Sequence, residues 1–512
     1  MDSVCTILIK YGMKIIMKTK KLCAILFAFS LLALAGCAFF GTPEPTEDEK
    51  FALECEKKLR ERVVEIRASE SEYEAGENGT VYYISNDGDD KNDGKSPETP
   101  IKTIRKLTSL QNAVSIKAGD VVLFRRGDMW RERFTAAVGV TYSAYGEGDK
   151  PVLNGNTFGD AADPDKWELV EGTENIWKYK EHILDVGNIV LNGGEKTAEK
   201  MLLSVDNKKF YVTINGKPFD LKSSFYKDEL FTCEYLAVSK NAADIDTKTR
   251  LYLRCDKGNP GEVYDSIELA YRGNLIRGAS GCTFDNLCIK YSGSHGIGMG
   301  AVNNVTVRNC EVGFIGGSAQ YFTNGYIVRY GNGIEIYGGC ENYTIDNCYV
   351  YQCYDAGITY QYGGEKEARQ KNVSFTNNVI EKCIYNIEYF THYTMENILF
   401  SDNILAYSGY GWGMNPERSA SIKGWNANNL SDGFVIKNNI FLLDRYNACD
   451  LGAKEEKWLP DFEGNTYVQV KGNNLTKIGS PTAEQYMFTK DALQILEGLG
   501  EISPKVYFVR RK

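Results

Sequence analysis

Val305-Thr-Val-Arg-Asn309 is one copy of a short phrase that recurs through the second half of this 512-residue chain. In each copy, apolar and polar residues alternate into an Asn or Asp. The other copies end at Asn286, Asn347, Asn377, Asp402 and Asn438, so the interval varies from 23 to 38 residues. Alternation with a period of two indicates a strand, and self-similarity at this spacing indicates a solenoid. The phrase therefore predicts stacked coils of short strands.

A second short strand follows each copy and carries Ile or Trp at its centre. These strands are His295-Gly-Ile-Gly-Met299, Asn332-Gly-Ile-Glu-Ile336, Ala356-Gly-Ile-Thr-Tyr360, Tyr385-Asn-Ile-Glu-Tyr389 and Tyr410-Gly-Trp-Gly-Met414. In a coiled chain each strand pairs with the rungs above and below, about 4.8 Å away, so the central residues stack into one apolar column. The Asn and Asp side chains should form ladders that satisfy backbone groups in the turns. We expect an all-β, right-handed parallel β-helix.

The N-terminus has the pattern of an export signal. Met17-Lys-Thr-Lys-Lys21 is basic, residues 22–35 are apolar, and Leu34-Ala-Gly-Cys37 resembles the lipobox of bacterial lipoproteins, whose cysteine receives lipid. The alternative is an ordinary signal peptide with an incidental cysteine. We expect a bacterial protein that is exported and held by lipid on Cys37 at the cell surface or at a periplasm-facing membrane.

Composition and pattern divide the rest of the chain. The net charge of −9 gives no excess of basic residues that could bind the phosphates of a nucleic acid, so no nucleic-acid partner is expected. After the signal (1–37), we expect a tether and short helix (38–79), a cap with the first coil (80–160), a β-rich intervening region (161–272), the main β-helix (273–479) and a C-terminal segment (480–512).

Segments of the first coil resemble the N-terminal cap of bacterial pectate-lyase-like β-helix proteins. They are Tyr82-Tyr-Ile-Ser85, Asp93-Gly-Lys-Ser-Pro-Glu-Thr-Pro100, Ile101-Lys-Thr-Ile104, Gly119-Asp-Val-Val-Leu-Phe124 and Tyr145-Gly-Glu-Gly-Asp-Lys-Pro151. The resemblance covers residues 80–475, and the chain looks most like uncharacterised relatives of β-helix glycoside hydrolases. It implies a polysaccharide or oligosaccharide as partner. No single family's catalytic motif is present, so no catalytic residue is carried over.

Aligning the second strands predicts where chemistry occurs. If the central residues face inward, the next residues form an outward column of Gly298, Glu335, Thr359, Glu388 and Gly413. Glu335 and Glu388 then lie two rungs apart, about 9–10 Å at the backbone. That is near the roughly 6.5–9.5 Å that leaves room for water in an inverting glycosidase. We expect Glu335 and Glu388 to be the acid and base, with Asp355 on the intermediate rung as first substitute. The alternative is a solvated acidic face.

Aromatic and basic residues surround this column. Aromatic rings stack on sugar faces, and long loops on a rigid scaffold concentrate binding residues. We expect walls from residues 313–331 and 414–431, although packing onto the coils explains the tyrosines equally well. The expected substrate-binding residues are His295, Arg329, Tyr337, Tyr360, His392, Trp412, Lys423 and Trp425.

Three functions fit these patterns. The leading hypothesis is a glycoside hydrolase that uses paired carboxylates and needs no cofactor. A polysaccharide lyase is the alternative: Arg329, Arg418 or Lys423 would abstract a proton beside a uronate carboxylate, and Ca²⁺ could neutralise that carboxylate. The third is a non-catalytic glycan-binding or adhesive surface protein.

Overall fold

The computed structural model describes most of the chain beyond the expected signal. The described residues are 44–76, 79–201, 204–205, 212–214, 217–218, 224–235, 248–323, 326–361, 369–390, 394–413, 416–425 and 431–511. The chain forms two units, Met1–Lys50 and Phe51–Lys512. Of the first, only 44–50 are described, and they include the start of helix α2 (Glu47–Ala68). The signal region with Cys37, and also His392, lie outside the described residues. Within the described part, no helix is long and apolar enough to span a membrane.

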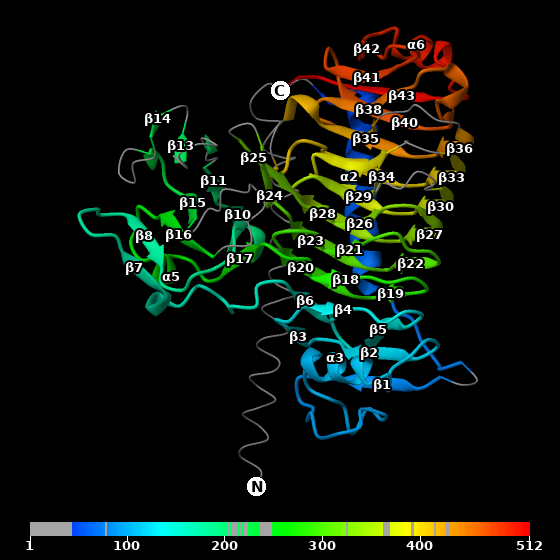
Figure 1. Ribbon diagram of the computed structural model, residues 1–512. Helices are drawn as coiled ribbons and strands as arrows, with labels where there is room; N and C mark the ends of the chain where they lie inside the picture. Colours follow the sequence, from blue (N-terminus) through cyan, green and yellow to red (C-terminus); the bar gives the residue numbers. More distant parts are fainter. Residues whose placement is uncertain are drawn as a thin grey trace, which may run out of the picture. The chain divides into compact units, whose positions relative to one another are not determined.

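Three ten-stranded sheets, here named A, B and C, make up the coils of the second unit (Figure 1). Sheet A contains β1 (Val81–Ile84), β2 (Val121–Arg125), β5 (Thr141–Tyr145), β19 (Thr283–Asp285), β22 (Val305–Arg308), β27 (Cys340–Asp346), β30 (Gln370–Thr376), β33 (Met395–Ser401), β36 (Ser431–Lys437) and β39 (Asp461–Glu463). Sheet B contains β3 (Met129–Trp130), β6 (Val152–Asn154), β20 (Cys288–Ser292), β23 (Glu311–Ile315), β28 (Tyr349–Cys353), β31 (Val379–Glu381), β34 (Ile404–Ala406), β37 (Ile440–Leu442), β40 (Thr466–Val470) and β43 (Lys505–Val509). Sheet C contains β4 (Phe134–Thr135), β18 (Ile276–Arg277), β21 (Ile297–Met299), β26 (Ile334–Tyr337), β29 (Ala356–Gln361), β32 (Tyr385–Phe390), β35 (Ala420–Trp425), β38 (Asn447–Gly452), β41 (Asn474–Gly479) and β42 (Glu484–Met487).

The chain visits the three sheets in rotation. From β19 to β41 each coil adds one strand to sheet A, then B, then C, and neighbouring coils pair in parallel, as in β27 with β30 and β29 with β32. Only at the end of sheet C does β42 turn back, pairing antiparallel with β41. The predicted right-handed parallel β-helix is confirmed.

The interior of the coil contains the predicted apolar column, with one correction. Five stacked isoleucines have no exposed surface and pair in register: Ile297, Ile334, Ile358, Ile387 and Ile422. The prediction that Trp412 occupies the fifth rung was wrong. Glycines at 409, 411 and 413, the first of them at φ +77°, turn the chain out of the coil, and β35 forms the rung instead.

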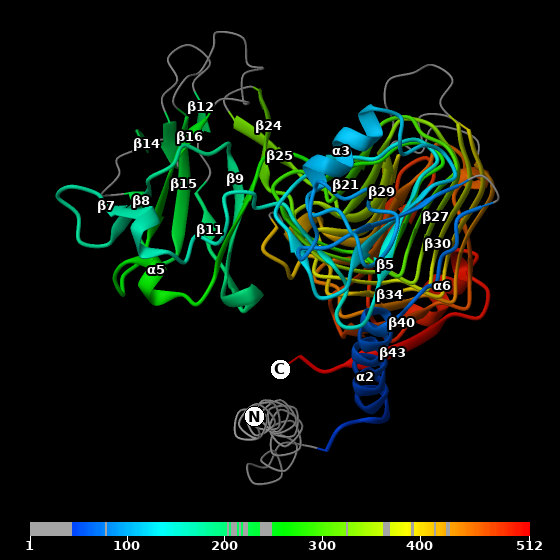
Figure 2. The same cartoon turned by 90° about the horizontal axis from the view of Figure 1, so that it is seen from below.

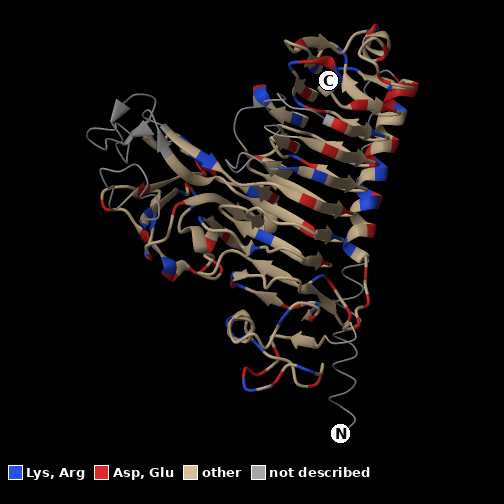
Figure 3. Cartoon of the chain, turned by 45° about the vertical axis from the view of Figure 1, so that its right-hand side comes forward, with Lys and Arg blue, Asp and Glu red and all other residues tan. Residues whose placement is uncertain are grey.

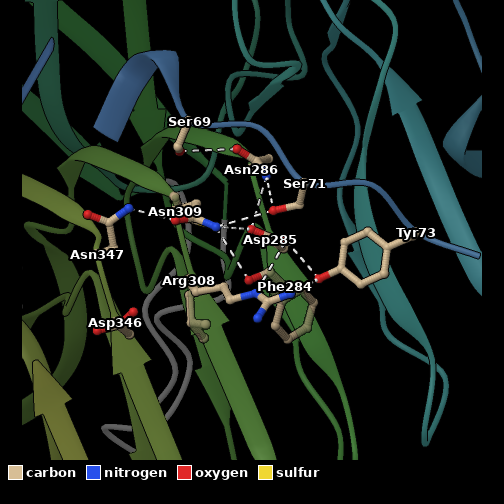
Figure 4. Close-up of polar contacts among 12 residues, drawn as sticks. Ser69, Ser71, Tyr73, Phe284, Asp285, Asn286, Arg308, Asn309, Asp346 and Asn347 are labelled. Carbon is tan, nitrogen blue, oxygen red and sulfur yellow. Dashed lines mark hydrogen bonds and ion pairs between the residues drawn. The ribbon is translucent and has the colours of Figure 1, made fainter. Parts of the chain in front are cut away.

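The predicted ladder of turn residues lies at the corner between sheets A and B (Figure 4). The phrase-ending residues all have φ between +51° and +58°, a left-handed conformation in which Asn and Asp are enriched. Their amides bond from coil to coil, since Asn347 Nδ2 donates to Asn309 Oδ1 at 2.6 Å and Asn309 Nδ2 donates to Asp285 Oδ1 at 2.7 Å. The segment after α2 joins this network through Tyr73, whose hydroxyl donates to Asp285 Oδ2 at 2.7 Å.

A second ladder of buried asparagines runs beside the first. The Nδ2 of Asn403 donates to Asn439 Oδ1 at 2.9 Å, and the Nδ2 of Asn439 donates to Asn465 Oδ1 at 3.1 Å. The same nitrogen of Asn439 also bonds the carbonyl of Phe400 at 3.0 Å. The ladder ends where Asn465 Nδ2 donates to Glu501 Oε1 at 2.9 Å. Buried backbone carbonyls thereby gain side-chain amide donors.

Helix α2 lies on the outer face of sheet B, beside β40 and β43 in Figure 2. Leu59 and Ile66 are completely buried in a cluster that includes aliphatic and aromatic side chains of sheet B. Arg60 forms a double hydrogen bond with Glu381, at 2.7 and 2.8 Å, and Arg67 holds Glu311 in the same way at 2.8 and 2.9 Å. The predicted short N-terminal helix is therefore present and tied to the coils.

The elements outside the coil form two excursions and several short helices. The insertion between β6 and β18 holds β7 (Trp167–Leu169), β8 (Ile176–Tyr179), β9 (Val186–Leu191), β10 (Lys196–Thr197), β11 (Glu199–Lys200), β12 (Ser204–Val205), β13 (Val212–Ile214), β14 (Lys217–Pro218), β15 (Leu230–Tyr235), β16 (Thr249–Arg254) and β17 (Ile267–Tyr271). The hairpin between β23 and β26 consists of β24 (Ser318–Thr323) and β25 (Tyr326–Tyr330). The helices are α3 (Ile104–Asn112), α5 (Pro260–Val263), α6 (Ala492–Gly498), η2 (Pro164–Lys166), η3 (Asn192–Gly194), η4 (Pro416–Arg418) and η5 (Glu456–Trp458).

These excursions share one corner of the coil. Each of these segments, namely the insertion, the hairpin and the loop 407–419, begins after a strand of sheet B and ends at a strand of sheet C. Long connections on a rigid scaffold are where binding residues concentrate. Sheet C is therefore the face on which a site is expected.

Candidate active site

The outward column of sheet C runs through seven consecutive rungs. Its members pair in register as Gly298, Glu335, Thr359, Glu388, Lys423, Asp450 and Lys477. The first four positions are those predicted, whereas the fifth is Lys423 rather than Gly413, because β35 supplies that rung. Charged residues of both signs mark successive strands of the coil in Figure 3. Glu335 and Glu388 lie two rungs apart, about 9–10 Å between backbones.

The two glutamates are buried, which corrects the expectation that they face solvent. Glu335 is 5% exposed and Glu388 is 3% exposed. Neighbouring polar and aromatic side chains cover them, and a single-strand pattern does not reveal such cover. Burying a carboxylate is costly unless hydrogen bonds or a proton compensate, so the partners of each carboxyl group matter.

Glu388 accepts hydrogen bonds from three sides. Gln361 Nε2 donates to Oε2 at 2.7 Å, Trp425 Nε1 donates to Oε1 at 2.7 Å, and Thr359 Oγ1 lies 3.2 Å from Oε2. Burial raises the pKa of Glu388 to about 7, and the charge of Glu335 adds to this rise, although the bonds from Gln361 and Trp425 oppose it. Near neutral pH this carboxyl group is therefore poised to hold or release a proton.

Glu335 is held by two residues from the ends of neighbouring strands. Asn332 Nδ2 donates to Glu335 Oε2 at 2.7 Å, and His295 Nδ1 lies 2.5 Å from the same oxygen. The backbone N–H of Asn332 also donates to His295 Nδ1, at 3.1 Å. His295, expected to bind substrate, is instead in direct contact with a candidate catalytic carboxyl group.

Asp355 completes a cluster of three carboxyl groups. It precedes β29, on the rung between those of Glu335 and Glu388, and it is partly exposed. Within the described part of the chain, no side chain or backbone N–H bonds to its carboxylate. Burial raises the pKa of Asp355 well above its usual value, and the charges of Glu388 and Glu335 raise it further. Mutual repulsion of this kind favours the protonated forms of Asp355 and Glu388.

Trp425 and Lys423 both lie beside Glu388. The ring of Trp425 stacks near Phe390 and meets Tyr385 edge to face, each at 6.1 Å between ring centres. Lys423 Nζ lies 4.3 Å from the centre of the same ring and forms an ion pair of 2.8 Å with Asp450. The aromatic group therefore orients Glu388 through the indole N–H.

Other expected binding residues lie elsewhere. Tyr360 is fully buried inside the coil, where its hydroxyl contacts Met395 Sδ at 3.2 Å, because it follows outward-facing Thr359 by one residue. Trp412 packs on Tyr354 at 5.5 Å and donates to a backbone carbonyl. Tyr360 and Trp412 are therefore engaged by the protein itself.

Arg329 and Tyr337 lie at the edge of the candidate active site. Arg329 donates to the carbonyls of Gly317 and Gly187, at 2.5 and 3.0 Å, and its guanidinium lies 4.3 Å from the ring of Tyr354. Tyr337 is 52% exposed at the end of β26, in register with Gln361. Tyr337 thus remains open to a ligand, whereas Arg329 is engaged by the protein itself.

Sequence reasoning assigned no site role to four residues that contact the cluster: Asn332, Gln361, Tyr330 and Tyr385. The first two lie at fixed offsets on the aligned strands, Asn332 three residues before Glu335 and Gln361 two residues after Thr359. Tyr330 lies on the hairpin, which is not part of the repeat, so alignment of the repeats does not locate it. Among the described residues, no group of three or more His, Cys, Asp and Glu side chains is arranged to hold a metal ion.

Comparison with known proteins identifies similar folds. No protein-family model matches the chain, and no curated protein matches it either. Among solved structures, XylC with xylose aligns at 13% identity and a TM-score of 0.36, over 80% of this chain and 73% of that one. The GH136 lacto-N-biosidase from Eubacterium ramulus aligns at 12% identity and 0.41, over 89% and 70%. The pectate lyase Pel9A aligns at 11% identity and 0.31, over 80% and 79%. Similarity at this level carries no argument about activity.

Proposed function

We propose that the chain is a glycoside hydrolase that cleaves a polysaccharide or oligosaccharide at the outer face of sheet C. The observation that carries the proposal is the cluster of Glu335, Asp355 and Glu388, in which burial and mutual repulsion raise the pKa of Asp355 and of Glu388. Strongly perturbed carboxyl groups gathered at one place are typical of functional sites. A site that holds both a protonated and an ionised carboxyl group has the acid and the base that glycoside hydrolysis needs.

In this mechanism Glu388 is the general acid. Its proton passes to the glycosidic oxygen as the bond to the anomeric carbon breaks, and Glu335 takes a proton from the water that attacks that carbon. The roughly 9–10 Å between their backbones approaches the separation of inverting enzymes, which must fit a water between the carboxyl groups. Asp355, between them and partly exposed, is the first substitute for either role.

Two of the three cations that a lyase could use, Lys423 and Arg329, are engaged by the protein itself. A lyase needs a free base and a positive group for the uronate carboxylate. Lys423 is paired with Asp450 at 2.8 Å, and Arg329 is bonded to backbone carbonyls. A cluster of three acids would also repel a uronate. These features favour a neutral sugar at the cleavage point.

The test measures hydrolysis with two variants and a control. The purified protein is incubated with a panel of neutral plant and microbial glycans, and products are followed by reducing-end release and mass. Glu388→Gln and Glu335→Gln should each lower kcat by about 100-fold or more, because acid and base catalysis typically contribute 10²–10⁴-fold. Glu341→Gln, at an exposed position on β27, should behave like the unmodified protein.

Three results would oppose the proposal. Full activity in both site variants would show that the carboxyl cluster is not the catalytic centre. Unsaturated products without added water would indicate a lyase. Glycan binding without any product would leave a binding or adhesive protein as the function.

We also propose that the protein works at a membrane surface through lipid on Cys37. The support is the sequence Leu34-Ala-Gly-Cys37 after an apolar run. Fractionation of cells that express the chain should place it with membranes, and Cys37→Ser should release it. Membrane association that survives this substitution would argue against lipidation.

A further inference from the structure

The hairpin β24–β25 meets the coil at a tightly packed base. The chain leaves sheet B through Gly316 and Gly317 and returns at Gly331. Gly331 has φ +139°, and a Cβ added to it would lie 2.0 Å from the Cα of Gly316. Only glycine fits such a close approach of two backbones. The base of the hairpin therefore has one well-defined position relative to sheet C.

The insertion holds the hairpin from the other side. Asp185, at the start of β9, accepts a bond of 2.7 Å from the backbone N–H of Ala319, and its carbonyl accepts one of 2.7 Å from Ser318 Oγ. Asp185 is completely buried and forms an ion pair of 2.6 Å with Lys200. Arg329 adds a bond from the other strand of the hairpin to the carbonyl of Gly187. A buried ion pair with satisfied hydrogen bonds favours one arrangement strongly over others.

Tyr330, the last residue of β25, connects the hairpin to the candidate active site. Its ring meets that of His295 edge to face, with 5.0 Å between centres and an angle of 82°. Its hydroxyl is 2.6 Å from Ser294 Oγ, next to His295 in the chain. The ring contact restricts rotation of the imidazole, and the hydroxyl contact ties Tyr330 to the same turn.

His295 in turn orients Glu335. His295 Nδ1 lies 2.5 Å from Glu335 Oε2, within hydrogen-bonding distance. The backbone N–H of Asn332 fixes the imidazole from a second direction. The rotamer of Glu335 thus depends on the place of the imidazole, which in turn depends on Tyr330.

We propose that Tyr330 and His295 are positioning residues for Glu335, and that the insertion contributes to catalysis by holding Tyr330 in place. The inference rests on the proposed hydrolase function, in which Glu335 acts on the attacking water. It assigns to His295 a role through another residue rather than contact with sugar. It also gives the insertion a catalytic purpose without requiring it to touch the substrate.

The kinetic test separates kcat from KM. His295→Leu and Tyr330→Ala should each lower kcat by about 100-fold, the cost of misplacing a catalytic group by about 1 Å, with KM nearly unchanged. His295→Asn, which keeps a polar atom near the position of Nδ1, should recover part of the loss, and so should Tyr330→Phe, which keeps the ring. Tyr226→Ala, at an exposed position in the insertion, is the matched control. A rise in KM at constant kcat would identify His295 as a sugar-binding residue and overturn the inference.

A spectroscopic test does not depend on activity. The chain has three histidines, so ¹⁵N labelling of histidine gives a spectrum simple enough to assign. The ¹⁵N resonance of His295 Nδ1 should shift in Glu335→Gln, and it should shift or broaden in Tyr330→Ala. Unchanged resonances in both variants would overturn the positioning role. If the unmodified protein cleaves no glycan but the resonance behaves as expected, the proposed function fails while the Tyr330–His295–Glu335 contact stands.

Discussion

Asp444 offers a direct test of the electrostatic reasoning, away from the candidate active site. It follows β37 inside the coil and is 1% exposed, beside a small cavity whose lining includes Phe441 and Tyr467. One carboxylate oxygen accepts bonds from Ser421 Oγ at 2.7 Å and from the backbone N–H of Ser408 at 3.1 Å. In the described part of the chain it has no cationic partner. Burial raises the pKa of Asp444 from 3.8 to about 7.

The sign of the effect on stability follows from the direction of this shift. Between about pH 4 and pH 7 the folded protein keeps the proton on Asp444, whereas the unfolded chain releases it. Stability therefore falls as pH rises through this window, and the full penalty applies above about pH 7. A difference of about 3 pKa units corresponds to about 4 kcal/mol. Asp444→Asn removes the titration and leaves only an offset that does not depend on pH.

The expected result is a widening difference between two stability curves. Urea unfolding, followed by the fluorescence of the six tryptophans, gives the free energy of unfolding of each protein from about pH 4 to about pH 8. The value for Asp444→Asn minus that of the unmodified protein should increase by about 4 kcal/mol across this range. Asp432→Asn, at an exposed position on β36, should give a constant difference. Parallel curves for Asp444→Asn would refute a raised pKa at this carboxyl group.

Three further outcomes are expected. The kcat/KM for glycan hydrolysis should decline as pH rises above about 7, because Glu388 must be protonated to act as the acid and its pKa is raised to about 7; a rate that rises through this range would contradict the assignment. Leu59→Ala should destabilise the protein by about 2–5 kcal/mol, since this fully buried side chain joins α2 to sheet B, and thermal unfolding would measure it. Asn439→Ala should cost about 1–3 kcal/mol in urea unfolding, because the buried carbonyl of Phe400 loses its donor; a neutral result would show that the ladder adds little to stability.

The coils were predictable because their determinants are local and repeated. A turn that needs φ near +55° selects Asn, and Asn347 or Asn377 marks that turn in the sequence as clearly as in the structure. Alternation within each strand then identifies the inward isoleucines and, by the same rule, the outward position of Glu335 and Glu388. Register follows because a shift by one residue would turn the isoleucines away from the coil interior and place the outward residues inside it.

The rest of the site depends on contacts that the repeat does not encode. The side chain that covers Glu388 is Trp425, which lies two residues after Lys423 on β35. The sequence pattern did not identify β35 as the fifth rung, because Trp412 between two glycines resembled the centre of a rung. Tyr330 reaches His295 only because a hairpin folds back at a glycine junction. Burial and pKa are set by such neighbours from other segments, so the pattern identified the carboxyl groups but not their environment.

The packing of α2 changes how the solenoid should respond to stress. In a plain repeat array each coil touches only its neighbours, so stability is a sum of nearest-neighbour terms and the ends can peel away one at a time. The cluster around α2 includes Tyr291 from β20 and Val468 from β40, which are six strands apart in sheet B. Because α2 packs across all of these rungs, their unfolding is coupled. Mechanical extension or proteolysis should therefore proceed in one large step while α2 stays docked, and coil by coil after it has been removed.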